Sequence, residues 1–169
     1  MSLLPAGADE VVVPVLVRDL TAADLPACAW SGSAVHLVQV ARELERAAAG
    51  EVDYLAVCTP AGFPVAIGCV DYQVAVGAGT LSQLGVLPAL RSCGLGTVLV
   101  RAAEDRVRSR GLRRAELGVE EGNPRARALY ERLGYVAYGR EPDAWDVEAP
   151  DGSLRRYETM CTLMRKDLS

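Results

Sequence analysis

The sequence predicts an α/β fold of the α+β kind, with a mixed, mostly antiparallel central sheet, a βαβ core and helices on both faces. The first observation is the order of the apolar segments: strand-like runs come first, and strands and helices alternate afterwards. The second is the length of 169 residues, 50% of them apolar, which suits one domain with a substantial core. We therefore expect a single domain over residues 1–169.

The first part of the chain predicts one strand and one amphipathic helix. Residues 11–17 form a β-branched run typical of a strand, and residues 21–24 supply a helix-start signal. Over residues 33–49 apolar side chains recur at helical spacing. Ser33 is the expected N-cap of this helix, and Gly50 is its expected C-terminal stop.

The next elements predict an antiparallel hairpin and a third strand. Residues 54–58 and 65–72 are apolar and β-branched, and the TPAGFP segment between them has the proline and glycine residues of a turn. Another strand-like run, residues 80–87, follows a second turn at VGAG.

The second half of the chain predicts the βαβ unit. Residues 94–109 form a helix with one apolar face, and its charged side chains, Glu104 among them, predict a solvent-exposed opposite face. A strand, a helix and two short strands are expected next, at residues 114–119, from Pro124, at 135–138 and at 157–164. Residues 140–154, rich in Pro, Asp and Gly, are expected to form a loop, either a mobile flap or an ordered surface loop.

Composition and charge exclude several classes of protein. A net charge of -4 and a pI near 5.1 lack the basic surface that nucleic-acid binding requires. No apolar run approaches the roughly 18 residues of a membrane-spanning helix, and residues 1–10 lack the basic start of a secretory signal. The scattered cysteines show no CxxC spacing, which argues against a disulfide framework and a metal site. We expect a cytoplasmic protein that binds neither nucleic acid nor membrane.

A glycine-containing stretch, VLPALRSCGLGTVLVRAAEDRVRSRG, joins a strand to a helix at residues 86–111. Gly94 and Gly96 leave backbone N–H groups uncovered at the positive end of the helix dipole, and Arg91 adds a full charge. Such a terminus binds phosphate, although a tight strand-to-helix turn explains the glycines equally well. A P-loop would require a lysine, and a dinucleotide fingerprint would require a third glycine where Leu99 stands.

Two motifs together carry a resemblance to a known family. Arg91-x-x-Gly94-x-Gly96 and the later NPRARALYERLGY, residues 123–135, resemble the paired motifs of the GNAT superfamily of acyl-CoA-dependent N-acetyltransferases. The second motif, N-x-x-A-x-x-L-Y-x-x-x-G-F/Y, is matched by Asn123, Ala126, Leu129, Tyr130, Gly134 and Tyr135. The matching core covers about residues 80–138.

The resemblance implies a binding site for acetyl-CoA as cosubstrate. Backbone amides of the glycine stretch would hold the pyrophosphate of coenzyme A: Arg91, Ser92, Cys93, Gly94, Leu95, Gly96 and Thr97. The main chain at Leu84 and Val86 would pair with the pantetheine arm, and one amide there would polarise the thioester carbonyl. Gly85 between them suits a bulge that splays this strand.

The resemblance also implies roles for two residues of the second motif. Tyr130 stands where the family's phenol protonates the departing thiolate, although its helical spacing also fits an aromatic packed against the sheet. Asn123 would contact the pantetheine, and as the residue before Pro124 it also suits an N-cap. These two roles of Asn123 are compatible.

The general base is the point at which the sequence departs from the family. The positions that carry a base glutamate in some members are Thr80 and Gly118 here. Glu116 and Glu120 share strand parity with Gly118 and are the candidates to accept the amine proton, unless they are simply solvated. A water chain serving an amine that enters deprotonated, or the single histidine His36, are the alternatives.

For the acceptor, a strip formed by Asp143, Trp145, Asp146 and Glu148 would attract a cation, unless the segment is a solvated loop with one anchoring Trp. The expected activity is direct transfer of an acetyl group to a primary amine of a small molecule or peptide. The alternative is a non-catalytic acyl-CoA-binding or sensing module. Dimers are common among such enzymes, so a homodimer stays open.

Overall fold

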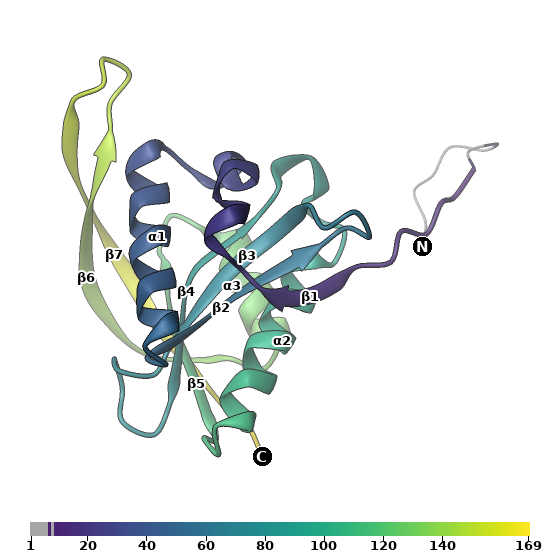
Figure 1. Ribbon diagram of the computed structural model, residues 1–169. Coiled ribbons are helices and arrows are strands. Elements are labelled where there is room, and N and C mark those ends of the chain that lie inside the picture. The colour runs from purple at the N-terminus through teal and green to yellow at the C-terminus, as the bar shows by residue number, and fades with distance from the viewer. Residues whose placement is uncertain (1–6, 8) are drawn as a thin grey trace.

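A seven-stranded sheet with the order β1-β2-β3-β4-β5-β7-β6 organises the computed structural model, which describes residue 7 and residues 9–169 (Figure 1). The strands are β1 (Leu16–Asp19), β2 (Val52–Cys58), β3 (Pro64–Asp71), β4 (Gly79–Val86), β5 (Arg114–Glu120), β6 (Val136–Glu148) and β7 (Leu154–Asp167). The helices are α1 (Ala34–Ala48), α2 (Leu95–Ser109) and α3 (Pro124–Arg132), with 3₁₀ turns η1 (Ala22–Ser31) and η2 (Pro88–Leu90).

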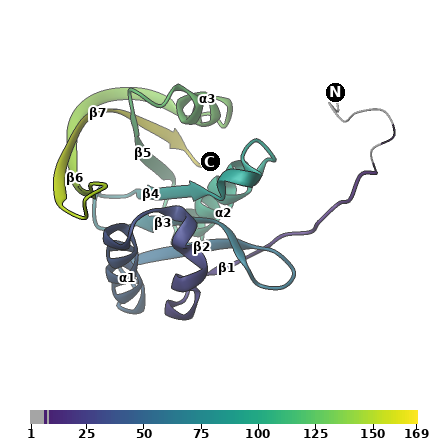
Figure 2. The same ribbon diagram turned by 90° about the horizontal axis from the view of Figure 1, so that it is seen from above.

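The predicted sheet and its βαβ core are confirmed. Neighbouring strands run antiparallel except β4 and β5, which run parallel and are joined through α2. Two cores cover the two faces: α2 and α3 pack on one, and η1 and α1 pack on the other. Figure 2 shows α1 and α3 on opposite sides of the sheet. Within the part of the chain that the structure describes, no helix is long and apolar enough to cross a membrane.

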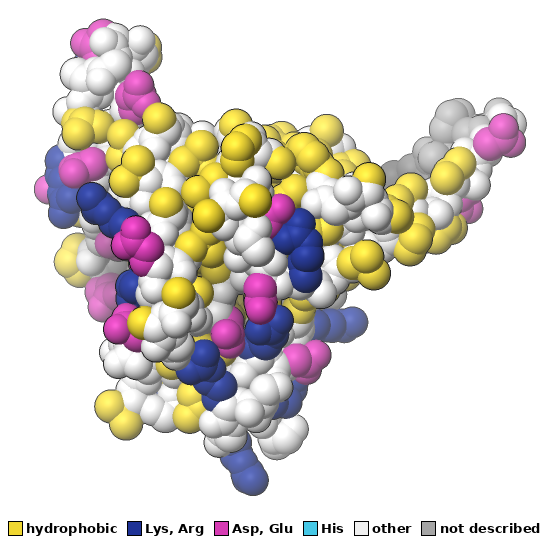
Figure 3. Space-filling view, viewed as in Figure 1, with side chains coloured by type: hydrophobic (Ala, Val, Ile, Leu, Met, Phe, Trp, Pro, Cys, Tyr) yellow, Lys and Arg dark blue, Asp and Glu magenta, His cyan; other side chains and the backbone are white. Residues whose placement is uncertain are grey.

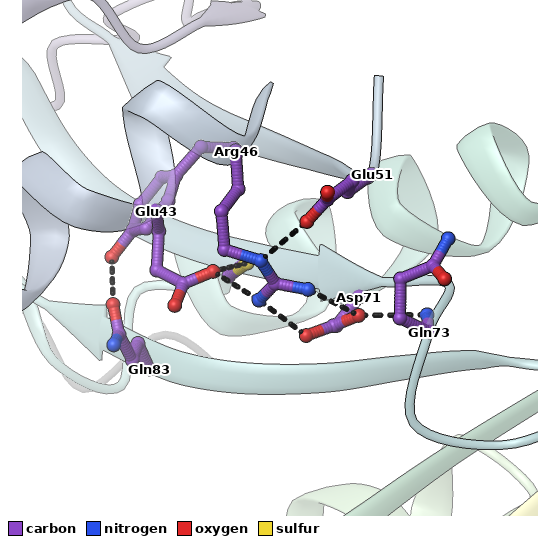
Figure 4. Close-up of polar contacts among 8 residues, drawn as sticks. Glu43, Arg46, Glu51, Asp71, Gln73 and Gln83 are labelled. Carbon is purple, nitrogen blue, oxygen red and sulfur yellow. Dashed lines mark hydrogen bonds and ion pairs between the residues drawn. The ribbon is translucent and has the colours of Figure 1, made fainter. Parts of the chain in front are cut away.

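Helix α1 begins and ends where the sequence predicts. The Ser33 hydroxyl accepts a hydrogen bond from the His36 N–H at 3.4 Å, and Gly50 adopts φ +78° directly after the helix end. The helix is fixed to β3 through the guanidinium of Arg46, which lies 2.7 Å from Asp71 and 2.8 Å from Glu51 (Figure 4). The end of α1 that carries Ser33 and His36 is therefore held in a defined place over the sheet.

The first predicted strand is partly wrong. Strand β1 covers Leu16–Asp19, and residues 11–15 lie outside it, with Val12 84% exposed. Pairing explains the difference, because β1 begins opposite Cys58, where its partner strand β2 ends. A β-branched run without a partner strand forms no ladder. Most of residues 1–10, on which the expectation about a secretory signal rests, lie outside the described residues.

The loop predicted at residues 140–154 is also wrong. Strand β6 continues to Glu148 and β7 begins at Leu154, so the two form a long hairpin whose turn is only residues 149–153. The ladder overrides the weak strand propensity of Asp143 and Asp146, and Pro142 is tolerated because β6 is an edge strand. Figure 1 shows this hairpin projecting past the N-terminal end of α1.

The exposed face predicted for α2 is wrong at Glu104. This side chain is 3% exposed, and its carboxylate accepts hydrogen bonds from Lys166 of β7 at 2.9 and 3.0 Å. The Tyr135 hydroxyl donates to the same carboxylate at 3.1 Å. A buried ion pair therefore joins α2 to β7 at the back of the βαβ unit.

The centre of the sheet opens between β4 and β5. The two strands pair only as far as Leu81 and Leu117, whereas β4 continues to pair with β3 up to Val86. The bulge expected at Gly85 lies nearby but not on that residue, since Gly85 pairs with Ile67 in register and the extra residue falls at 83–84. Opposite the bulge stands Gly68, where an added Cβ would lie 2.4 Å from Leu84 Cδ2.

Candidate active site

The first cleft lies where the glycine stretch, α3 and the open part of β4 meet. It has a volume of about 620 Å³. Of the residues expected to bind acetyl-CoA, the cleft is lined by Leu84, Val86, Arg91, Ser92, Gly94, Gly96, Thr97, Asn123 and Tyr130. Cys93 and Leu95 belong to the same turn but do not line the cleft, because Cys93 is exposed to solvent and Leu95 packs into the core.

The two glycines of the stretch have separate structural reasons. Gly94 is the N-cap of α2 and adopts φ +87°, a left-handed conformation that a Cβ strains. At Gly96 an added Cβ would lie 3.0 Å from Leu129 Cδ2, so this glycine allows α3 to approach α2 closely. The structure therefore confirms the tight-turn interpretation of the glycines, and phosphate binding by this turn stays a prediction.

The charge of the first cleft is wholly positive. Its charged lining residues are Arg91, Arg125 and Arg132, and no described carboxylate lines it. The Arg125 guanidinium donates to the Ser92 hydroxyl, which brings α3 against the glycine stretch. Sequence reasoning missed Arg125 and Arg132 because they occupy unspecified positions of the second motif. A signal was available, since Arg125 and Arg132 lie near the two ends of the same short helix, next to positions that the motif specifies.

A second, larger cleft of about 1060 Å³ lies on the other side of the opening between β4 and β5. It extends from the N-terminal end of α1 across β4 and β5 to the β6–β7 hairpin. Tyr130 lines both clefts, as do Leu84, Asn123 and Ala126. The two clefts therefore meet at the phenol of α3.

Tyr130 is held in a mostly apolar environment. It is 9% exposed, and its ring lies 6.1 Å from that of Tyr135 in an edge-to-face arrangement. Burial raises the pKa of its phenol above the ordinary value of 10. The phenol is therefore a proton donor, and not a phenolate, throughout the neutral range.

Asn123 performs the capping role expected of it. Its side-chain oxygen accepts a hydrogen bond from the Ala126 N–H at 3.1 Å, at the start of α3. The residue also lines both clefts, which places it at the junction between them.

The candidate bases Glu116 and Glu120 line the second cleft on either side of Gly118, as their strand parity predicts. Glu116 forms an ion pair with Arg114 at 2.9 Å and accepts a hydrogen bond from Tyr138 at 3.2 Å. Glu120 accepts a hydrogen bond from the Tyr157 hydroxyl at 2.7 Å and has no cationic partner among the described residues. Of the two carboxylates, Glu120 is the better placed to accept a proton.

Thr80, which stands where some family members carry a base glutamate, and the alternative base His36 also line the second cleft. Thr80 pairs with Glu116 across the parallel ladder, and its hydroxyl oxygen is buried without a hydrogen-bond partner in the described residues. His36 lies 3.2 Å from the Ser31 hydroxyl, and burial lowers the pKa of its imidazole below 6.5. A neutral His36 therefore adds no positive charge to the cleft at pH 7.

The strip on β6 faces the second cleft. Asp143, Trp145, Asp146 and Glu148 all line it, and the Trp145 ring packs on Tyr157 of β7 at 4.9 Å. Acidic side chains are visible on this hairpin at the upper left of Figure 3. The strip thus lies on a regular hairpin and not on a loop, while its three acids are exposed to solvent.

A buried tyrosine supports the bulge that opens the sheet. The hydroxyl of Tyr54, a residue 1% exposed, donates to the Gln83 side-chain oxygen at 2.9 Å. Gln83 adopts φ +52°, a conformation that costs a non-glycine residue energy and requires support from its surroundings. Figure 4 shows Gln83 below Glu43 and beside the Arg46 cluster. The sequence gives no sign of this contact, because it joins strands that are not adjacent in the sheet.

Comparisons with known proteins agree with the geometry. A 58-residue segment is 49% identical to the mycothiol acetyltransferase of Beutenbergia cavernae, covering 34% of this chain and 20% of that protein. The chain spans about a fifth of the length of the curated relatives it matches.

Two solved structures show the same fold. The ribosomal-protein-alanine N-acetyltransferase from Brucella melitensis is 22% identical with a TM-score of 0.68, over 90% of this chain and 99% of that one. An acetyltransferase from Salmonella typhimurium, solved with its cofactor acetyl-CoA, is 20% identical with a TM-score of 0.67, over 92% and 95% of the two chains. The model of the acetyltransferase (GNAT) family matches residues 35–135. The chain therefore belongs to the acetyltransferase (GNAT) family.

Proposed function

We propose that the protein transfers the acetyl group of acetyl-CoA directly to a primary amine of a small molecule or peptide. The observation that carries this proposal is the meeting of two clefts at Tyr130, one lined by arginines and the other by carboxylates. A thioester held in the first cleft and an amine held in the second would face each other beside one phenol.

The first cleft suits the phosphates of coenzyme A. The N-terminal amides of α2 and the arginines Arg91, Arg125 and Arg132 supply donors and positive charge. The main chain of β4 beyond Leu81 has left its ladder with β5 and can pair instead with the pantetheine amides. Leu84, at the bulge, lies at the junction of the clefts, where a backbone N–H would polarise the thioester carbonyl.

Proton transfer then follows from the protonation states of the side chains. The amine nitrogen attacks the carbonyl carbon and the carbon–sulfur bond breaks. Glu120 accepts the proton that the amine loses, directly or through a water molecule, and Tyr130 gives its proton to the departing sulfur. Glu116 already forms an ion pair with Arg114, and we therefore do not assign it as the base.

Calorimetry with acetyl-CoA tests the first half of the proposal. We expect micromolar binding by the wild type and a loss of at least about tenfold in Gly94→Ala, whose Cβ strains the N-cap of α2. The matched control is Gly111→Ala, which introduces a Cβ at a similar φ of +74° beyond the opposite end of α2. Equal binding by wild type and both variants would show that the glycine stretch is a packing feature alone.

A non-catalytic acyl-CoA-binding module is the second candidate. The observation that favours it is the lack of a carboxylate at Thr80 and Gly118, where the family resemblance implies a base. Release of CoA thiol with an amine panel separates the two: amine-dependent release supports the transferase, and tight binding without release supports the module. The cytoplasmic location and a homodimer stay predictions from the sequence.

A further inference from the structure

The second cleft carries an unbalanced negative charge. Its lining includes six carboxylates, Glu116, Glu120, Glu141, Asp143, Asp146 and Glu148, and neither arginine nor lysine. Arg114 compensates Glu116 from outside the cleft, and Arg156 does the same for Asp146 at 3.3 Å. For the other four, the described residues provide no ion pair. Repulsion among these carboxylates falls when cations enter the cleft.

The carboxylates are arranged in a line that leads away from the reacting centre. Glu120 lies near the junction with the first cleft, and the β6 acids follow one edge of the sheet toward the hairpin tip. Glu141 and Glu148 are separated by about 23 Å along the strand, at about 3.3 Å per residue. A single ammonium group would neutralise one end of this row and leave the other uncompensated.

Two further features of the cleft suit a flexible aliphatic cation. Trp145, whose ring packs on Tyr157, lines the cleft and offers an aromatic surface beside the acids, on which methylene groups and ammonium groups both pack well. At the floor, the Thr80 hydroxyl oxygen is buried and lacks a hydrogen-bond partner within the described residues. An amine N–H seated at the floor would supply that missing donor.

We infer that the acceptor is an elongated small molecule with at least two amino groups. One amine is deprotonated and receives the acetyl group beside Tyr130, while another stays protonated and is held by the uncompensated carboxylates of β6. This inference rests on the proposed transferase function, because it names the substrate class of the same site. The acids of β6 are specificity determinants and not catalytic residues.

A matched pair of amines tests the inference in a thiol-release assay. Diaminopentane and hexylamine have the same number of heavy atoms and differ only in a second amino group. We expect kcat/KM to be about tenfold higher for diaminopentane at low ionic strength, and this advantage to shrink as salt is added. Equal or faster acetylation of hexylamine by the wild type would overturn the inference while leaving the transferase function intact.

Variants of the hairpin identify the carboxylates responsible. In Asp143→Asn/Glu148→Gln the diamine advantage should fall toward one. The control is Glu158→Gln, which removes a carboxylate from β7 of the same hairpin that does not line the second cleft. Loss of the advantage in the control, or its persistence in the double variant, would contradict the inference.

Binding measurements keep the inference testable if no amine is acetylated. Spermidine, a linear triamine, should bind the wild type in calorimetry without acetyl-CoA and bind the double variant at least about tenfold more weakly. No binding to the wild type would overturn the inference on its own. Binding without any turnover would retain the polycation site and reject the transferase function.

Discussion

At the scale of single residues, the proposed proton transfer rests on how two similar carboxylates differ in their partners. Glu116 and Glu120 lie on the same strand and the same face, yet only Glu116 has an arginine beside it. Glu120, which has no ion pair among the described residues, is therefore the carboxylate left available to the amine. Sequence parity places both residues at the cleft, but it says nothing of Arg114, Tyr138 or Tyr157 as their partners.

We therefore expect Glu120→Gln to lower kcat by about 10²-fold at pH 7, because no carboxylate then accepts the amine proton. The loss should diminish at higher pH, where more of the amine enters already neutral. Glu116→Gln, made as the matched control, should change kcat far less. Steady-state rates from pH 6 to 10 check this, and equal effects of the two substitutions would assign the proton to another acceptor.

At the scale of the elements, the bulge in β4 lies where this strand has separated from β5 and the sheet opens between the two clefts. The sequence indicates that a glycine-containing strand precedes the glycine stretch, and this strand was predicted nearly to the residue. The position of the bulge could not be predicted, because it depends on Gly68 of β3 and Tyr54 of β2. The same limit explains the β6–β7 hairpin, whose ladder forms between segments of low strand propensity.

Tyr54→Phe should raise the KM for acetyl-CoA several-fold. The substitution removes the hydroxyl that holds Gln83 in its left-handed conformation, and it should reduce the free energy of unfolding by about 1 kcal/mol. Tyr72→Phe is the control. The Tyr72 hydroxyl donates to Asp53 at 2.6 Å, and neither residue lines one of the two clefts. A similar stability loss with an unchanged KM is expected there. If Tyr54→Phe also left the KM unchanged, the tyrosine would have no role in positioning the bulge.

The turn η1 leads into the residues that line the second cleft, and Asp24 stabilises its start. The Arg18 guanidinium, 2.7 Å from Asp24, lowers the pKa of that carboxyl from 3.8 to about 2. Because the folded-state pKa is the lower one, the stabilisation is complete above pH 3.8 and is lost as pH falls toward 2. Asp24→Asn should therefore show a flatter pH dependence of unfolding in this window, measured by urea titration. An unchanged slope would argue against the ion pair.

At the scale of the whole molecule, the helices and the sheet bring opposite charges to two sides of one opening. The order of the elements along the chain, the βαβ core and the family could be predicted from the sequence, since they follow from apolar periodicity and two local motifs. The charge of the second cleft could be predicted only in part. Three of its acids are visible as a strip, but their alignment with Glu120 requires the fold to bring β5 and β6 together.

The ion pair between Lys166 and Glu104 joins α2 of the βαβ unit to β7. Lys166→Met should reduce the free energy of unfolding by about 3 kcal/mol, because it leaves a carboxylate buried without its cation. Arg108→Met, which removes a more exposed cation 3.8 Å from the same carboxylate, should cost less than about 1 kcal/mol. Denaturant unfolding of both variants checks the difference. Equal losses would show that Lys166 does not compensate the buried charge.

The most direct measurement compares the wild type with Tyr130→Phe in acetyl-CoA-dependent thiol release, with acetyl-CoA binding measured in parallel. We expect kcat to fall by about 10²-fold to 10⁴-fold, since the departing sulfur loses its proton donor. The affinity for acetyl-CoA should be unchanged, because the ring stays in place and only the hydroxyl is removed. Since burial raises the pKa of Tyr130 above 10, the wild-type rate should show no loss from deprotonation of this phenol below that pH. A Tyr130→Phe variant with the wild-type kcat would contradict a direct transfer in which this phenol protonates the leaving group.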